Sequence, residues 1–148
     1  GAHPILVTPT SRRRFDENGK SVNTHGDYPD AVRWVAAKEN VPLIELNGMT
    51  AILFNALGVD NSTKAFVHYP AGTFPGQTRE FKDNSHFSTY GAYETAKCVV
   101  EGMKKAKLDI SNYLRADYKG FNPAQPDKFE TFKWNLCPFT EIEKPDGN

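Results

Sequence analysis

Residues 4–9, PILVTP, and residues 27–47, DYPDAVRWVAAKENVPLIELN, decide the fold. The first stretch is a short apolar run between prolines, which is typical of a buried strand. The second begins with Asp27, a good N-cap, and its pattern predicts an amphipathic helix that ends near Asn40. The apolar side of this helix consists of Tyr28, Ala31, Val32, Val35 and Ala36. Residues 42–47 are a second apolar run and are expected to form a strand, so the order strand, helix, strand favours an α/β fold.

Two more helices are expected further along the chain. One covers about residues 48–57 and stops at Gly58, and the other runs from residue 88 or 89 to 106. Residues 67–82 contain several prolines and glycines, which predicts an irregular segment. Phe132, Trp134 and Leu136 alternate with polar residues, so residues 129–136 are expected to form a half-exposed strand.

The composition limits the kinds of protein to which this chain could belong. Its 148 residues are enough for one domain with a core, and its 18 basic and 18 acidic side chains leave no net charge. This balance argues against a nucleic-acid partner and against a polybasic membrane binder. The mean hydropathy is −0.59, and no apolar run approaches the roughly 18 residues of a membrane span.

Two cysteines, Cys98 and Cys137, leave two interpretations open. They are too few for a disulfide framework, and neither belongs to a C-x-x-C pair, so a structural zinc site is not expected. One alternative is a disulfide between them. The other, which we prefer, is a free buried thiol at Cys98 inside the expected third long helix.

Asp83 and His86 are the candidate catalytic residues. An aspartate three residues before a histidine on a turn can fold back and accept a hydrogen bond from the near ring nitrogen. This contact fixes the tautomer and leaves the other nitrogen free as a general base. The alternative is a helix-capping turn in which Asp83 or Ser85 caps and His86 is solvated. Ser85 and Ser88 are not candidate nucleophiles, because Ser85 is held by the same turn and Ser88 is better placed as a helix cap.

The sequence around this pair resembles a known family. Residues 82–94, KDNSHFSTYGAYE, resemble the last sequence block of the SGNH (GDSL-type) hydrolases, in which Asp-x-x-His supplies two members of a Ser-His-Asp triad. Further segments resemble the rhamnogalacturonan acetylesterase branch of that family, namely residues 4–9, 12–15, 25–29, 41–47 and 68–72.

This resemblance covers roughly residues 2–108 and carries several implications. It implies part of a flavodoxin-like α/β/α sandwich, with parallel strands and helices on both faces. It implies an O-acetylesterase that removes acetyl groups from pectic polysaccharide, with Asp83 as the orienting acid and His86 as the general base. It implies no cofactor, and it implies secretion or a periplasmic location, although no signal peptide is visible in this sequence.

The sequence lacks the other blocks of the family. A Gly-Asp-Ser block would carry the nucleophile and a Gly-x-Asn-Asp block an oxyanion donor, and neither motif is present. We therefore expect residues 1–108 to be the C-terminal half of an SGNH domain, with residues 109–148 as an extension that packs on it. The chain alone is expected to be inactive and to pair with a missing N-terminal half, or to self-associate through its first strand at residues 5–7. The alternative is a non-catalytic truncated module or sugar-binding fragment with no turnover.

Other polar and aromatic residues have plainer interpretations beside functional ones. No metal site is expected, because the spacing of His25 and His68 relative to His86 matches no ligand pattern. Residues 12–14, three consecutive arginines, either bind an acidic sugar or lie in solvent beside Asp16 and Glu17. Aromatic residues that could stack on sugar rings, although packing is the more common role, are Tyr69, Phe74, Phe87 and Trp134.

Overall fold

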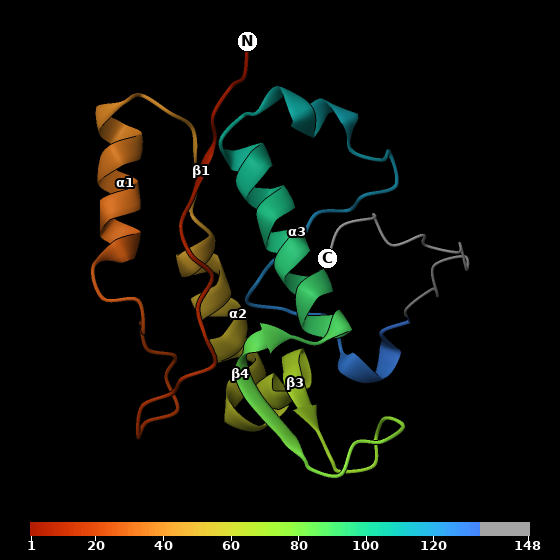
Figure 1. Ribbon diagram of the computed structural model, residues 1–148. Coiled ribbons are helices and arrows are strands. Elements are labelled where there is room, and N and C mark those ends of the chain that lie inside the picture. The colour runs from red at the N-terminus through yellow and green to blue at the C-terminus, as the bar shows by residue number, and fades with distance from the viewer. Residues whose placement is uncertain (134–148) are drawn as a thin grey trace, which may run out of the picture.

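A computed structural model describes residues 1–133 of the chain (Figure 1). Its elements, in chain order, are β1 (Leu6–Val7), α1 (Tyr28–Lys38), β2 (Leu43–Ile44), α2 (Leu46–Asn61), η1 (Ser62–Ala65), β3 (Phe66–Tyr69), β4 (Phe81–Phe87), α3 (Thr89–Lys105), η2 (Asp109–Tyr113) and η3 (Phe129–Thr131). None of the helices in this part of the chain has the length and apolar character needed to cross a membrane.

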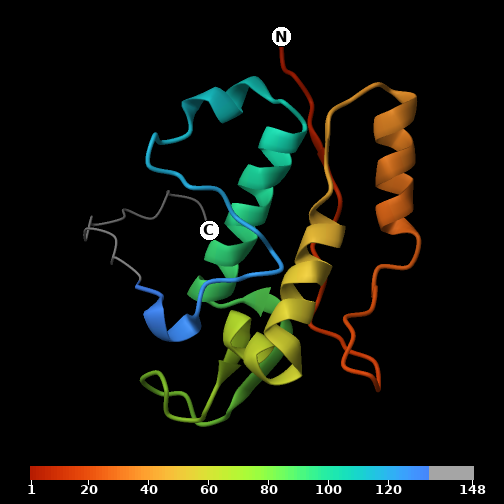
Figure 2. The same ribbon diagram turned by 180° about the vertical axis from the view of Figure 1, so that it is seen from behind.

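The first two strands form a parallel pair flanked by helices. Leu6 pairs with Leu43, and Val7 pairs with Ile44. Helix α1 lies on one side of this pair and α3 on the other (Figures 1 and 2). The expected strand, helix, strand order is therefore present, and the predicted α/β class with parallel strands is confirmed.

Helix α1 forms where it was predicted, but its apolar side is largely exposed. The buried residues of this helix are Pro29 and Ala36, whereas Tyr28 is 73% exposed. Asp27 occupies the N-cap position without a side-chain hydrogen bond to the helix. Within residues 1–133 this helix packs mainly against the short strand β1, which covers little of its apolar side.

Helix α2 departs from the prediction at both ends. The second strand ends at Ile44, and the helix begins at Leu46 because Glu45 accepts a hydrogen bond from Gly48 N at 3.2 Å and acts as its N-cap. Gly58 does not end the helix as predicted. It adopts φ 74° and ψ 179°, which kinks the chain before the helix resumes and continues to Asn61.

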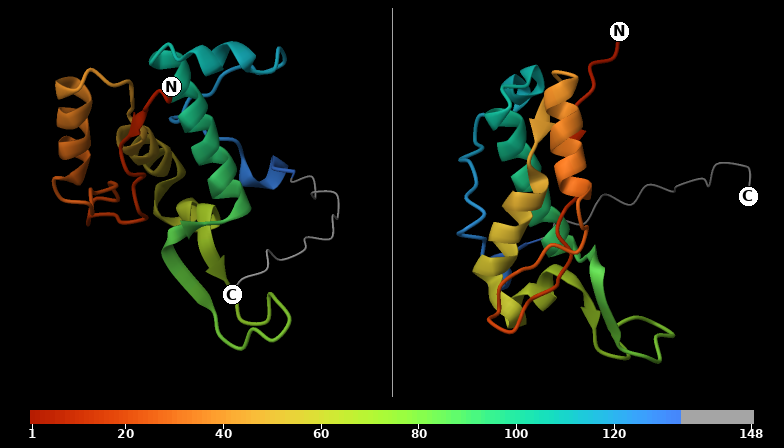
Figure 3. Two further views of the ribbon diagram at one scale, coloured as in Figure 1. Left: turned by 45° about the horizontal axis from the view of Figure 1, so that its top comes forward. Right: turned by 90° about the vertical axis from the view of Figure 1, so that its left-hand side faces the viewer.

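The segment over residues 67–82 is less irregular than predicted. Strands β3 and β4 form an antiparallel pair, which projects with its connecting loop from one end of the molecule (Figure 3). The sequence of β4, FKDNSHF, lacks the apolar alternation that marks a strand, so its pairing with β3 was not predictable from local pattern.

The core lies between α2, α3 and the β3–β4 pair. Phe54, Phe66 and Phe87 form an aromatic cluster with ring centroids 5.0–6.3 Å apart. Phe87 is partly buried and packs against the core, the more common of the two roles expected for it. Cys98 is buried and free, as we preferred, whereas Cys137 lies outside the described residues.

Helix α3 follows its prediction and crosses η1 closely. Ser88 is its N-cap and accepts a hydrogen bond from Gly91 N at 3.2 Å. A Cβ atom on Gly91 would lie 1.8 Å from the carbonyl oxygen of Ala65, so only glycine allows this close approach.

Gly91→Ala is expected to lower the free energy of unfolding by about 3 kcal/mol, because the added methyl group meets backbone that cannot move aside without displacing η1. Urea denaturation measures the change. The matched control is Gly48→Ala in α2, where the nearest atom to a new Cβ, Glu45 Oε1, is 3.6 Å away. Equal destabilisation by the two substitutions would contradict this account of the helix contact.

We call the segment from residue 109 onwards the tail. Over its described part, residues 109–133, it does not form the predicted strand. Residues 129–131 form the 3₁₀ helix η3, and residues 134–136 of the predicted strand lie outside the described residues. In a 3₁₀ turn, residues three apart point the same way. Phe129 and Phe132 accordingly both pack on Tyr90, with ring centroids 5.4 and 5.5 Å from it. Contact with α3 thus overrides the alternating pattern.

Candidate functional site

The candidate catalytic residues lie on a four-residue bulge in β4. Phe66 pairs with Phe87 and His68 pairs with Lys82, so Val67 alone opposes residues 83–86 on the other strand. We call residues 83–86, DNSH, the arch. A bulge of this kind bends the strand and re-aims side chains, and bulges are common beside active sites.

The carboxylate of Asp83 organises the arch. Its Oδ1 accepts hydrogen bonds from the backbone N–H groups of Ser85 at 2.6 Å and His86 at 2.9 Å. Its Oδ2 lies 2.6 Å from Nδ1 of His86. The contact expected from the Asp-x-x-His spacing is therefore present, and it fixes the tautomer in which Nδ1 carries the proton. Neither Asp83 nor Ser85 caps α3, because Ser88 does so.

His86 presents its other ring nitrogen to the outside. The side chain is 80% exposed, and within residues 1–133 its Nε2 has no hydrogen-bond partner. An open hollow of about 620 Å³ adjoins the arch and is lined by Val67, Glu80, Phe81, Lys82, Asp83 and Asn84. An imidazole with its near nitrogen on a carboxylate and its far nitrogen free can accept a proton from a group brought against it.

The hydrogen bonds of the arch hold the pKa of Asp83 at about 2, below its ordinary value of 3.8. The backbone N–H of His86 contributes most to this lowering, followed by the N–H of Ser85 and then the His86 imidazole. Because the folded pKa is depressed, the carboxylate stabilises the arch above pH 3.8, and this contribution is lost as the pH falls through about 2.

We expect the carboxyl carbon of Asp83 to titrate with a midpoint at about pH 2 when followed by NMR. In His86→Ala both backbone donors remain, so the midpoint should rise only part of the way towards 3.8. A midpoint near 3.8 in the unmodified chain would show that the arch is not formed in solution.

The three arginines of residues 12–14 have different environments. Arg13 is partly buried and donates from Nη1 to Asn84 Oδ1 at 3.1 Å, whereas Arg12 and Arg14 are exposed. The predicted alternative, pairing with Asp16 and Glu17, does not form. Asp16 instead accepts backbone hydrogen bonds within its own turn.

The remaining histidines do not gather around His86 as ligands. His25 Nε2 lies 2.9 Å from Thr10 O, and His68 Nε2 lies 2.8 Å from Asn84 Oδ1. In the part of the chain that the structure describes, no group of three or more His, Cys, Asp or Glu residues could hold a metal ion.

The aromatic candidates also have partners within the protein. Tyr69 and Phe74 meet edge to face with centroids 5.1 Å apart, and Trp134 lies outside the described residues. Sequence reasoning missed Asn84, whose amide oxygen is shared by two donors from distant segments. Its position between Asp83 and His86 was the only signal available.

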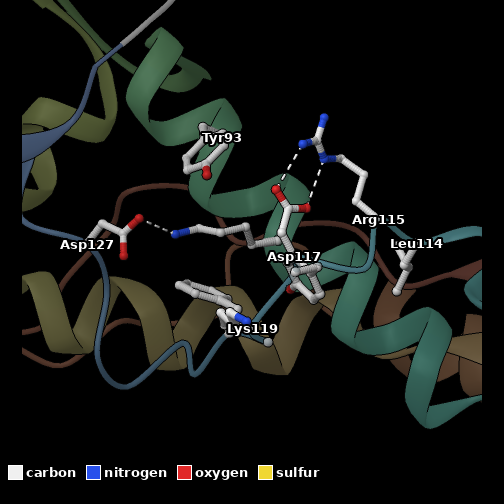
Figure 4. Close-up of a pocket in the computed structure, with 10 residues that line it drawn as sticks. Tyr93, Leu114, Arg115, Asp117, Lys119 and Asp127 are labelled. Carbon is white, nitrogen blue, oxygen red and sulfur yellow. Dashed lines mark hydrogen bonds and ion pairs between the residues drawn. The ribbon is translucent and has the colours of Figure 1, made fainter.

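A second hollow, of about 440 Å³, lies between α3 and the tail (Figure 4). Arg115 and Asp117 pair with each other at 2.9 Å, and Lys97 pairs with Asp127 at 2.7 Å. Its charged groups are largely neutralised by one another, so this hollow offers a weaker site than the arch.

Two known proteins are similar to this chain in sequence. No family model matches the chain. The chain is 42% identical over 114 residues to the rhamnogalacturonan acetylesterase RhgT of Bacillus subtilis (strain 168), a match that covers 77% of this chain and 49% of that protein. It is 34% identical over 114 residues to the probable rhamnogalacturonan acetylesterase YesY of the same organism, covering 77% of this chain and 48% of that protein.

A solved structure shows the same fold. The crystal structure of protein YXIM from Bacillus subtilis matches with a TM-score of 0.53 and 23% identity, over 74% of this chain and 27% of that chain. The chain spans about half the length of the curated relatives it matches. The two sequence matches confirm the resemblance to rhamnogalacturonan acetylesterases.

Proposed function

We propose that this chain, a homologue of the rhamnogalacturonan acetylesterases over 77% of its length, supplies the histidine and aspartate of a carbohydrate O-acetylesterase. In this proposal His86 is the general base and Asp83 orients it. The observation that carries the proposal is the 2.6 Å contact between His86 Nδ1 and Asp83 Oδ2, with Nε2 left free. The substrate class is an acetylated pectic polysaccharide.

The chemistry needs a hydroxyl nucleophile placed against Nε2 of His86. As the serine oxygen attacks the acetyl carbon, Nε2 takes its proton, and Asp83 stabilises the imidazolium through Nδ1–H. The same proton then passes to the departing sugar oxygen as the acyl C–O bond breaks. Water attacks the acyl-enzyme, gives one proton to His86, and releases acetate as serine recovers that proton.

The serine and the oxyanion donors of this scheme come from outside the given sequence, which contains neither Gly-Asp-Ser nor Gly-x-Asn-Asp. Residues that complete the sheet would pair along the edge of β1 that has no strand partner within residues 1–133, since its other edge is paired with β2. Val7 on this strand and Ile5 just before it are exposed, which suits either an N-terminal half or a second copy of the chain. A secreted or periplasmic location is part of the same proposal.

A second candidate function is a sugar-binding module without turnover. The high exposure of His86 favours it, since no described residue shields the imidazole from water. Both candidate functions use the arch. They differ in whether a nucleophilic hydroxyl is placed against Nε2 of His86.

Acetate release from acetylated rhamnogalacturonan distinguishes the two functions. We expect none from the chain alone, and release from a fusion in which the unmatched half of the 42% identical relative precedes the chain. Replacement of the nucleophilic serine of that half by alanine is the control and should abolish release. A folded fusion that binds the polysaccharide but releases no acetate would establish the sugar-binding alternative.

A further inference from the structure

We infer that Arg13 is a positioning residue that holds the arch, through Asn84, in the shape that lets Asp83 orient His86. The catalytic meaning of this inference rests on the proposed function. The structural part, that Arg13 sets the state of the His86 imidazole, stands independently and can be tested without activity.

The arch needs support from outside its own strand. The residues that flank it, Lys82 and Phe87, pair with β3, whereas the four residues of the arch itself face Val67 alone. The hydrogen bonds of Asp83 all lie within the arch, where the His86 side chain is 80% exposed and water competes for the same groups, so they do not hold the shape of the arch by themselves. External contacts at the middle of the arch therefore decide where the imidazole points.

Asn84 receives these external contacts. Its backbone oxygen accepts a hydrogen bond from Arg13 N at 2.9 Å. Its side-chain Oδ1 accepts one from Arg13 Nη1 at 3.1 Å and lies 2.8 Å from His68 Nε2, which donates to it. Arg13 thus donates hydrogen bonds to both the main chain and the side chain of Asn84, a residue 71 positions away in sequence.

Arg13 is itself firmly held. Its Nε donates to Ser62 Oγ at 3.0 Å, and its Nη2 donates to the carbonyl oxygen of Val59 at 2.6 Å, just beyond the kink at Gly58. Burial lowers the pKa of the guanidinium, although Asp60 offsets this in part. One planar guanidinium reaches three acceptors at fixed angles, which the single ammonium of lysine cannot reproduce.

This geometry makes the choice of arginine specific. Arg13→Lys keeps the charge and the backbone contact to Asn84 but loses the planar set of N–H donors that reaches Ser62, Asn84 and Val59 together. Asn84→Ala removes the amide oxygen and leaves the contacts of Arg13 with Ser62 and Val59 in place. Arg14→Ala is the matched control, since Arg14 is an exposed neighbour whose side chain bonds to no described residue.

The first test is nitrogen-15 NMR of the His86 ring in the unfused chain. We expect an Nδ1–H signal in the unmodified chain and in Arg14→Ala, and loss of this signal in Arg13→Ala, Arg13→Lys and Asn84→Ala. Circular dichroism identifies the variants that are folded, and Asn84→Ala serves if Arg13→Ala fails to fold. An unchanged Nδ1–H signal in folded Arg13→Lys and Asn84→Ala would overturn the inference.

The second test uses the fusion with acetylesterase activity. Arg13→Lys is expected to lower kcat by about tenfold to a hundredfold with KM little changed, because displacing a catalytic group by roughly 1 Å has effects of this order. An inactive unmodified fusion would count against the proposed function alone, since the NMR result does not depend on it. Loss of the Nδ1–H signal without any change in kcat would overturn the catalytic part of the inference.

Discussion

His86→Ala in the active fusion is expected to lower kcat by about 10³–10⁴-fold, the effect of removing a general base that both takes and returns a proton. KM should change little, because the His86 imidazole is 80% exposed and, among residues 1–133, hydrogen-bonds only to Asp83, so it contributes little to binding the polymer. Initial rates of acetate release over a range of substrate concentrations separate the two parameters.

The matched control for this substitution is Ser85→Ala on the same arch. Its hydroxyl makes no hydrogen bond to a described residue, whereas its backbone N–H, which alanine retains, binds Asp83. We expect it to leave kcat almost unchanged. Retention of most activity in His86→Ala would show that another base serves the reaction and that the contact with Asp83 is structural.

The predictable parts of the fold are those set by local sequence. Helix α3 follows from its apolar stripe and from Ser88, which caps it within three residues. The β3–β4 pair was missed because Phe81–Phe87 carries polar residues where a strand would alternate, and its pairing depends on β3 across a loop. The 3₁₀ turn at Phe129–Thr131 likewise depends on Tyr90, a residue distant in sequence.

The candidate site shows the same division. The contact between Asp83 and His86 joins residues three apart, so their spacing alone predicts it. The roles of Arg13 and His68 depend on contacts with Asn84 that span 71 and 16 positions. No spacing rule connects these positions, and only the folded chain brings them together. The contact between Asp83 and His86 could therefore be predicted from sequence, but not the bulge that carries it or the anchoring of that bulge to the body of the protein.

Lys97→Met is expected to destabilise the folded chain by about 3–5 kcal/mol at pH 7, because it leaves a buried carboxylate without its counter-charge. Glu94 is 0% exposed, and the side chain of Lys97 is 11% exposed. Lys97 Nζ lies 2.8 Å from Glu94 Oε1, as an ion pair without the alignment of a hydrogen bond, and 2.7 Å from Asp127 Oδ2 in the tail. It also lies 4.2 Å from the centre of the Phe121 ring.

The pH dependence of this stability loss tests whether Glu94 is its cause. Burial raises the pKa of Glu94 above its ordinary 4.5, and Lys97 partly offsets this effect. A raised folded pKa means that the folded chain binds the proton more tightly than the unfolded chain, so the penalty grows as the pH rises above 4.5. Without Lys97 the pKa of Glu94 should rise further. The deficit of Lys97→Met should therefore be largest near neutral pH and shrink as the pH falls towards 4.5.

Two further variants test this explanation by urea denaturation. The double variant Glu94→Gln, Lys97→Met removes the buried charge and should recover much of the lost stability. Lys104→Met breaks an exposed pair with Glu101 on the same helix and should cost less than about 1 kcal/mol. If Lys97→Met costs no more than Lys104→Met, the Glu94 carboxylate is not confined between α3 and the tail. The tail would then be held mainly by the packing of Phe129 and Phe132 on Tyr90.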